Sequence, residues 1–191
     1  MKTLSDIAEV IVGQITQRVA GEKNEEGNVR VLVPKAITEG TIDDRNLDTL
    51  NLSKDVSDDK YTKEGDVVIK LSTPFEAAYI DKDHEGLLIP SFCAVVRFIE
   101  EYDPKGMCAI LNSTYIQDQV KAMIGGAIRP MVKVTDLRAV EIPDFKNEDL
   151  KKLGDEYIKS GEKRRILVQL AENERQIMDN TVLGLIKEAL S

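Results

Sequence analysis

The sequence has little of the chemistry that most enzymes need. Its 191 residues include one histidine, two cysteines and no tryptophan. His84 lies in a charged turn without a second histidine or a cysteine nearby, so we expect a solvent-exposed side chain and no metal site or acid–base pair. Glycine-rich phosphate loops and the nucleophile elbow of hydrolases are also absent. We therefore expect a binding or assembly protein, not an enzyme.

Long apolar runs and targeting signals are missing as well. No run approaches the ~20 residues of a membrane span, and residues 1–6 acquire an acidic side chain at once, unlike a signal peptide. Cys93 and Cys108 are far apart in apolar surroundings, which favours buried, reduced thiols and a cytoplasmic protein. The length of 191 residues suits one domain plus an appendage, and 42% apolar with 31% charged residues is the composition of an ordinary soluble protein.

Positive charge is scarce in the first three quarters of the chain. The net charge is −8, and residues 1–145 hold 25 acidic side chains against 17 basic ones, whereas residues 146–191 hold nine of each. An acidic domain argues against a general nucleic-acid surface. The acid pairs Asp43-Asp44 and Asp58-Asp59 are predicted to be solvated loop charges, with a cation site as the alternative. Within the first 145 residues, basic residues outnumber acidic ones between residues 104 and 138. The basic residues there are Lys105, Lys121, Arg129, Lys133 and Arg138, and the acidic ones after Pro104 are Asp118 and Asp136.

Short β-rich segments dominate residues 1–145. A turn or short helix around Leu4 precedes a strand that ends at Gly13, and further strands are predicted at 29–33, 67–71, 77–80, 87–89, 92–99 and 138–142. The segment 92–99 is apolar at nearly every position, as in a central strand. Helices are predicted at 107–111 and after Ser113, and residues 38–64 should form a partly ordered surface excursion. This order predicts an α+β fold with a mixed, curved sheet and a few helices.

Residues 147–191 have the pattern of a short helix followed by a long amphipathic one. The apolar positions of the long helix fill a sector about 160° wide at 100° per residue. So wide a stripe favours a partner helix, although a helix folded back on its own domain is the alternative. We divide the chain into a domain at 1–145 and a helical dimerisation or spacer segment at 146–191. The stripe includes Ile166, Leu167, Leu170, Ile177, Met178, Val182 and Leu185.

Four motifs follow one another along the whole chain. They are Leu4-x-x-Ile7 leading to Gly13; Val33-Pro34-Lys35-Ala36-Ile37 followed by Gly40-x-Ile42; Tyr61 followed by Gly65-Asp66 and the strand 67–69; and Gly125-Gly126-Ala127-Ile128-Arg129 followed by Leu137 and the strand 140–142. Their order and spacing resemble one half of the DNA-specificity (S) subunit of type I restriction–modification systems. That half is a target-recognition domain followed by a coiled-coil spacer helix. The chain departs from the family where Glu148-Asp149 replaces the Glu-Gln pair that often opens the last helix, and it holds one half where the full subunit has two in tandem.

The resemblance implies a role without catalysis. An S subunit reads two short half-sites and holds methyltransferase subunits, which carry S-adenosylmethionine; restriction subunits can join. No cofactor is expected on this chain. A half-subunit is expected to form a homodimer through the apolar stripe and to read double-stranded DNA at an interrupted palindrome. The alternative function is a protein-interaction or decoy module that binds methyltransferase subunits without reading DNA, which the acidic domain favours.

Candidate DNA contacts come from the local charge and the position of loops. Arg129 follows a glycine turn and precedes a proline, and an ion pair with the acidic excursion is the alternative for it. The strand that follows Gly65-Asp66 ends in a loop where Lys70, Ser72 and Thr73 offer a cation and two hydroxyls. The full set of candidates is Arg129, Lys133, Lys121, Lys70, Ser72, Thr73 and Lys35.

Overall fold

A computed structural model of the chain describes residues 1–21, 27–38, 40–124 and 131–190. Its contacts divide the chain into two compact units, Met1–Ile158 and Lys159–Ser191. The boundary lies inside α5 (Asn147–Ala189), a single helix of 43 residues. The predicted break between a short and a long terminal helix is therefore wrong. No helix in the described ranges is both long and apolar enough to cross a membrane.

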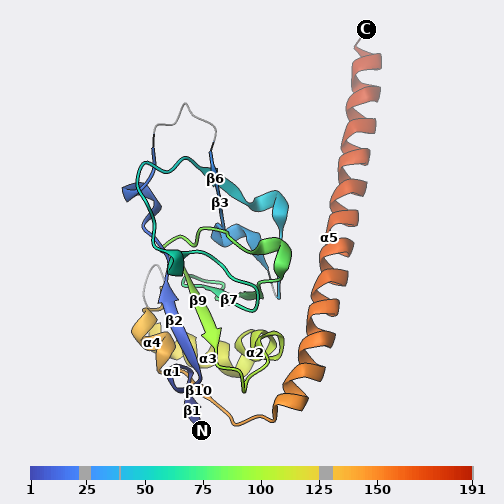
Figure 1. Ribbon diagram of the computed structural model, residues 1–191. Helices are drawn as coiled ribbons and strands as arrows, with labels where there is room; N and C mark the ends of the chain where they lie inside the picture. The colour runs from blue at the N-terminus through green and yellow to red at the C-terminus, as the bar shows by residue number, and fades with distance from the viewer. Residues whose placement is uncertain (22–26, 39, 125–130, 191) are drawn as a thin grey trace. The chain divides into compact units, whose positions relative to one another are not determined.

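The first unit is built on a four-stranded sheet in the order β2-β9-β7-β8 (Figure 1). The strands are β2 (Ala8–Val12), β9 (Cys93–Phe98), β7 (Val67–Lys70) and β8 (Ala77–Tyr79), and every neighbouring pair is antiparallel. The internal position of β9 agrees with its apolar sequence, because apolar clusters cover both of its faces. The predicted α+β class is confirmed.

Three two-stranded ladders surround this sheet. They pair β1 (Lys2–Thr3) with β10 (Glu141–Ile142), β3 (Val29–Val31) with β6 (Asp48–Leu50), and β4 (Ile37–Thr38) with β5 (Thr41–Ile42). The predicted excursion at 38–64 therefore contains strands, whereas the predicted strand at 87–89 makes only isolated bridges. The 3-10 turns are η1 (Thr16–Arg18), η2 (Pro34–Ala36), η3 (Asp44–Asn46), η4 (Asp58–Lys60) and η5 (Lys82–His84).

Each face of the sheet packs against its own apolar cluster. Val67 and Ile69 belong to one cluster and Val68 to the other, as the two-residue period of a strand requires. Loop residues from 32–42 and 80–89 build the second cluster. The first takes side chains from four short helices, α1 (Leu4–Ile7), α2 (Pro104–Leu111), α3 (Thr114–Ile124) and α4 (Val134–Arg138).

Two polar residues that the sequence places in solvent are buried. His84 is only 9% exposed, and its Nδ1 and Nε2 lie 2.6 and 3.2 Å from carboxylate oxygens of Asp81 and Asp44. Asp43 is 6% exposed and binds the Arg45 guanidinium at 2.8 Å, and hydrogen bonds from Arg45 lower the pKa of its carboxyl. The prediction of solvated side chains was wrong at both positions, because the turns fold these groups onto polar partners. The described residues contain no cluster of three or more metal-ligating side chains that could hold an ion.

The start of α5 belongs to the first unit through a close helix crossing. A Cβ at Gly106 of α2 would lie 2.3 Å from the Leu150 carbonyl oxygen, and a Cβ at Gly154 would lie 2.5 Å from the Gly106 nitrogen. Leu150 itself is 1% exposed. The two backbones therefore touch, and only glycine leaves room for that contact.

We expect Gly154→Ala to destabilise the domain by roughly 1–3 kcal/mol, because the added methyl group meets backbone atoms that cannot yield. Gly184 lies in the same helix with nothing within 4 Å of its notional Cβ, so Gly184→Ala is the matched control. That change should stabilise the helix by about 1 kcal/mol through helix propensity alone. Urea denaturation of both variants measures the difference; equal midpoints would contradict the close crossing.

Candidate nucleic-acid interface

Four segments meet at one end of the sheet, where β2 and β7 finish and β9 begins. The Gly13 amide donates to the Cys93 carbonyl at 3.0 Å, and the Leu71 amide donates to the Phe92 carbonyl at 2.9 Å. The Val132 amide in turn donates to the Leu71 carbonyl at 2.9 Å. We call this surface the carboxylate-free end; it comprises residues 12–18, 71–75, 88–92 and 131–135.

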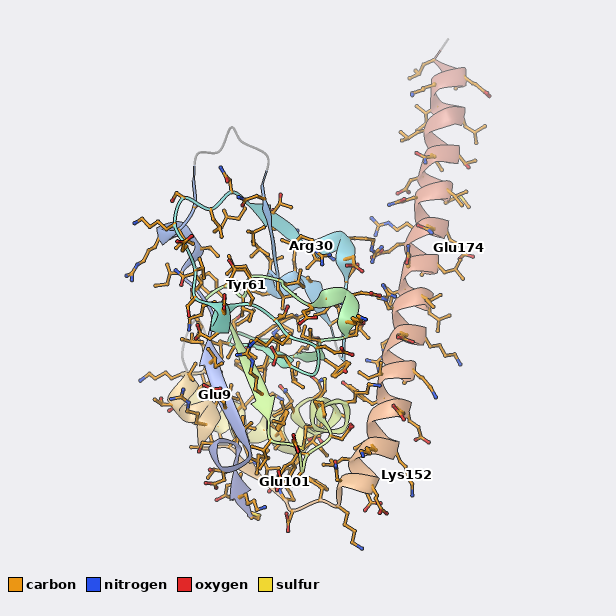
Figure 2. All side chains as sticks on the ribbon, in the orientation of Figure 1. Glu9, Arg30, Tyr61, Glu101, Lys152 and Glu174 are labelled. Carbon is orange, nitrogen blue, oxygen red and sulfur yellow. The ribbon has the colours of Figure 1, made fainter. Side chains whose placement is uncertain are left out.

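The carboxylate-free end has a charge unlike that of the rest of the domain. None of its four segments contains aspartate or glutamate, although the chain carries a net charge of −8. Arg18 and Lys133 are exposed there, and neither forms an ion pair within the part of the chain that the structure describes. Glu100 and Glu101 follow the opposite end of β9, where Figure 2 shows Glu101. Exposed cations in segments that contain no acidic residue make this end suited to an anionic partner.

A hollow of about 190 Å³ borders this end between the β3-β6 ladder and the turn before β9. Its lining includes Thr16, Pro34, Thr49 and Phe92, and Asp48 is the one carboxylate in it. The lining combines two threonines with a phenylalanine, so the hollow offers hydrogen bonds and an apolar contact together.

Several of the sequence-predicted candidates gather here. Ser72 pairs with Met131 in an isolated bridge, and Thr73 and Lys133 are exposed beside them. Lys35 is exposed next to Pro34 at the hollow. These residues come from distant parts of the chain, and the sheet brings them to one surface.

The remaining candidates lie elsewhere or are already engaged. The Lys70 side chain is 10% exposed and its Nζ lies 2.6 Å from Glu76, so it neutralises a carboxylate instead of facing solvent. Lys121 is exposed on α3, outside the four segments, in an ion pair with Asp118 at 3.3 Å. Arg129 lies outside the described residues. The candidate interface therefore does not include Lys70 and Lys121.

Sequence reasoning missed the residues contributed by the turn before β9 and by the end of β2. Phe92 was assigned to a buried strand, yet its side chain is 53% exposed. Gln14 and Arg18 were not singled out, and the available signal was the absence of any carboxylate from residue 10 to residue 21. The absence of acids from this segment indicates a binding surface only once the fold places the segment next to residues 71–75 and 131–135, which also lack acids.

The two thiols are buried, as predicted. Cys93 adjoins the carboxylate-free end through its backbone, and burial raises the pKa of its thiol to about 12. Burial likewise raises the pKa of Cys108. Both side chains are neutral at physiological pH and act as small apolar groups in the core.

The second unit consists of the rest of α5 alone, so no other element within it can cover the apolar stripe. The exposed fractions of the predicted stripe residues range from 46% at Val182 to 66% at Ile177. Leu183 and Ile186 are also exposed and were not among the predicted residues.

The sign of the net charge changes along this segment of α5. Residues 159–171 hold Lys159, Lys163, Arg164 and Arg165 against Glu162, and residues 172–189 hold Glu172, Glu174, Asp179 and Glu188 against Arg175 and Lys187.

This arrangement of strands, short helices and a long terminal helix also occurs in solved structures. The chain is similar to the HsdS subunit from Thermoanaerobacter tengcongensis with a TM-score of 0.61 and 17% identity over 91% of the chain. It is similar to the S subunit of the type I restriction–modification system from M. genitalium with a TM-score of 0.59 and 14% identity over 94% of the chain. A third structure, described as a type I R-M system in complex assembly, matches with a TM-score of 0.59 and 14% identity over 92% of the chain. The chain has the fold of one half of a type I S subunit.

The chain covers 45%, 43% and 41% of the lengths of these three structures, in the order given above, which is less than half of each. No family model and no curated protein matches the sequence. The local structure explains the Gly65-Asp66 pair. Gly65 has φ +89°, a conformation that glycine adopts without strain, and Asp66 then turns inward to bind Arg97.

Proposed function

We propose that this chain is a non-catalytic DNA-recognition half-subunit of a type I methyltransferase complex, and that its carboxylate-free end reads one half-site. The observation that carries the proposal is the S-subunit fold, which extends over both the domain and the terminal helix. The charge of this end supports it, since Arg18 and Lys133 are exposed in segments that contain no acidic residue. Methyltransferase subunits would supply S-adenosylmethionine and the chemistry, and restriction subunits could join them.

The side chains at this end divide into two kinds of DNA contact. Lys133, Arg18 and Lys35 would bind phosphates, which position a protein without reading sequence. Ser72, Thr73 and Gln14 carry donors and acceptors that can pair with base edges. Arg129, which precedes the described segment 131–135, remains a predicted phosphate or guanine contact.

A second copy of the chain is the partner that we propose for the apolar stripe of α5. The charges support an antiparallel pair, because the basic half of one helix would lie along the acidic half of the other. A parallel pair would place like charges together at both ends. The antiparallel dimer joins two domains about a two-fold axis, so it would read an interrupted palindrome.

Mapping of adenine methylation in host genomes with and without this gene tests the proposed function. Loss of one two-part palindromic motif is the expected result. Loss of an asymmetric motif would mean that the helix pairs with a different half-subunit. An unchanged set of motifs would refute the DNA-recognition role.

The dependence of DNA affinity on salt tests the phosphate contacts. In the assembled complex, Lys133→Ala and Arg18→Ala should each lower the slope of log affinity against log salt by about 1, because each removes one phosphate contact. Lys133→Ala combined with Arg129→Ala should lower the slope further. Lys63→Ala is the matched control, because Lys63 is an exposed lysine outside the four segments. Equal slopes for Lys133→Ala and Lys63→Ala would contradict the placement of the interface.

A protein-interaction or decoy module is the second candidate, and the acidity of residues 1–145 favours it. In that case the domain would bind methyltransferase subunits and compete with a DNA-reading S subunit. Added expression of this gene would then reduce methylation at sites read by other S subunits. Under the proposed function it would leave those sites methylated and add its own motif.

A further inference from the structure

Phe92 is the only one of the four phenylalanines that is more than half exposed, and all four lie in described segments. Phe75 is 2% exposed, and Phe98 and Phe145 pack against the first apolar cluster. Phe92 instead stands in the turn that precedes β9, with 53% of its surface accessible. A single exposed aromatic residue is ordinary on a protein surface. Phe92 differs from an ordinary exposed residue in two ways: backbone hydrogen bonds hold its turn in place, and the surrounding surface contains no acidic residue in its four segments.

The backbone holds the Phe92 turn on both sides. The Ser91 amide donates to the Gln14 carbonyl at 2.8 Å, and the Leu71 amide donates to the Phe92 carbonyl at 2.9 Å. The turn also lies directly on the end of β2, where a Cβ at Gly13 would be 2.1 Å from the Pro90 carbonyl oxygen. The backbone that carries the aromatic side chain is thus held in place by the ends of β2 and β7.

The surroundings of Phe92 combine apolar, polar and cationic groups. Ile15 and Met131 are 39% and 46% exposed, and the segments that carry them are bonded to the Phe92 turn or to its neighbour β7. Thr73 and Lys133 are exposed in the same four segments, which contain no carboxylate. A surface that combines an exposed apolar side chain with hydroxyls and cations suits a duplex, where apolar base faces lie between two rows of phosphates.

We propose that Phe92 acts as a wedge that presses on one base step of the half-site and partly opens its stacking, with Ile15 and Met131 supporting the ring. Lys133 and Arg18 hold the flanking phosphates. This inference rests on the proposed function. It adds that the half-site contains a readily unstacked step, such as TA or CA/TG, at the position that meets Phe92.

Duplexes that carry 2-aminopurine at successive positions of the methylated motif test the wedge. The probe fluoresces more strongly when its base is unstacked. The complex assembled with its methyltransferase subunit should raise the fluorescence at one step of each half-site without S-adenosylmethionine. Phe92→Ala should abolish that rise and weaken DNA binding about tenfold or more, whereas Phe92→Leu should retain part of both effects. Ile99→Ala is the matched control, because Ile99 is 46% exposed just beyond the other end of β9.

The possible outcomes separate the wedge from the proposed function. Specific DNA binding by Phe92→Ala with an undiminished fluorescence rise would overturn the wedge alone. Weaker binding of Phe92→Ala to the purified methyltransferase subunit without DNA would also overturn it and would make Phe92 a protein contact. Absence of specific binding by the wild-type complex to any duplex would instead refute the proposed function. Circular dichroism confirms that Phe92→Ala and Phe92→Leu are folded.

Discussion

The double substitution Leu170→Glu/Ile177→Glu is expected to convert the proposed dimer into monomers at micromolar concentration. Both side chains are more than half exposed in the single chain and belong to the apolar stripe. In an antiparallel pair each would be covered by the other helix, and a carboxylate in that place would be desolvated without a partner. Each buried charge costs several kcal/mol, and every 1.4 kcal/mol is a factor of ten, so the dimer dissociation constant should rise at least a thousandfold.

Sedimentation equilibrium measures that change, and methylation of the bipartite motif in cells should disappear with it. Gln169→Glu/Gln176→Glu is the matched control. It introduces the same two charges at the same seven-residue spacing, one position earlier, on the polar side of the helix. A dimer that survives the first pair of substitutions, or that is lost equally with the second, would show that the stripe is not the contact.

Removal of Arg97 is expected to destabilise the domain by about 3–5 kcal/mol, which is a large share of the stability of a typical domain. Its Nε lies 2.9 Å from the Asp66 carboxylate, and its NH2 group donates to the Tyr61 carbonyl at 2.9 Å. The Asp66 side chain is only 4% exposed and also accepts from the Lys63 amide at 2.8 Å. Arg97→Ala would leave that carboxylate buried without its cation, and the desolvation cost would no longer be offset. Urea denaturation measures the loss.

Two further variants separate this effect from lost packing. Arg97→Met combined with Asp66→Asn should recover much of the stability, because no charge is left unpaired. Asp155→Ala breaks the Lys105–Asp155 pair at 3.4 Å, whose side chains are 37% and 62% exposed, and should cost less than about 1 kcal/mol. Similar losses for Arg97→Ala and Asp155→Ala would contradict the argument from burial.

The sequence predicts those parts of the fold that depend on local pattern. The apolar run of β9 implied a central strand, and the helix predicted at 107–111 lies within α2, which begins at Pro104 after Asp103, whose side chain accepts a hydrogen bond from the Gly106 amide. It could not predict that His84 and Asp43 are buried, because their partners depend on how the turns fold. Leu87–Ile89 is apolar enough for a strand, but its neighbours offer it only single bridges.

The candidate site was predictable only in part for the same reason. The composition identified the loops that carry Ser72, Thr73 and Lys133, and the structure places them together. Lys70 has the same charge as Lys133 but faces Glu76 across the turn between β7 and β8, a pairing that only the fold determines. Phe92 was hidden in an apolar run, because its exposure depends on where β9 begins.

The continuity of α5 also limits how the protein can change in length. Each residue inserted into its second half would turn everything beyond it by 100°, so most insertions would move part of the stripe to the polar side. Seven added residues nearly complete two turns and restore the stripe, while they extend the helix by about 10.5 Å. This equals about three base pairs at 3.4 Å each. If α5 sets the distance between half-sites, the tolerated length variants of this helix will differ by multiples of seven residues. The gap between the half-sites will then change in steps of about three base pairs.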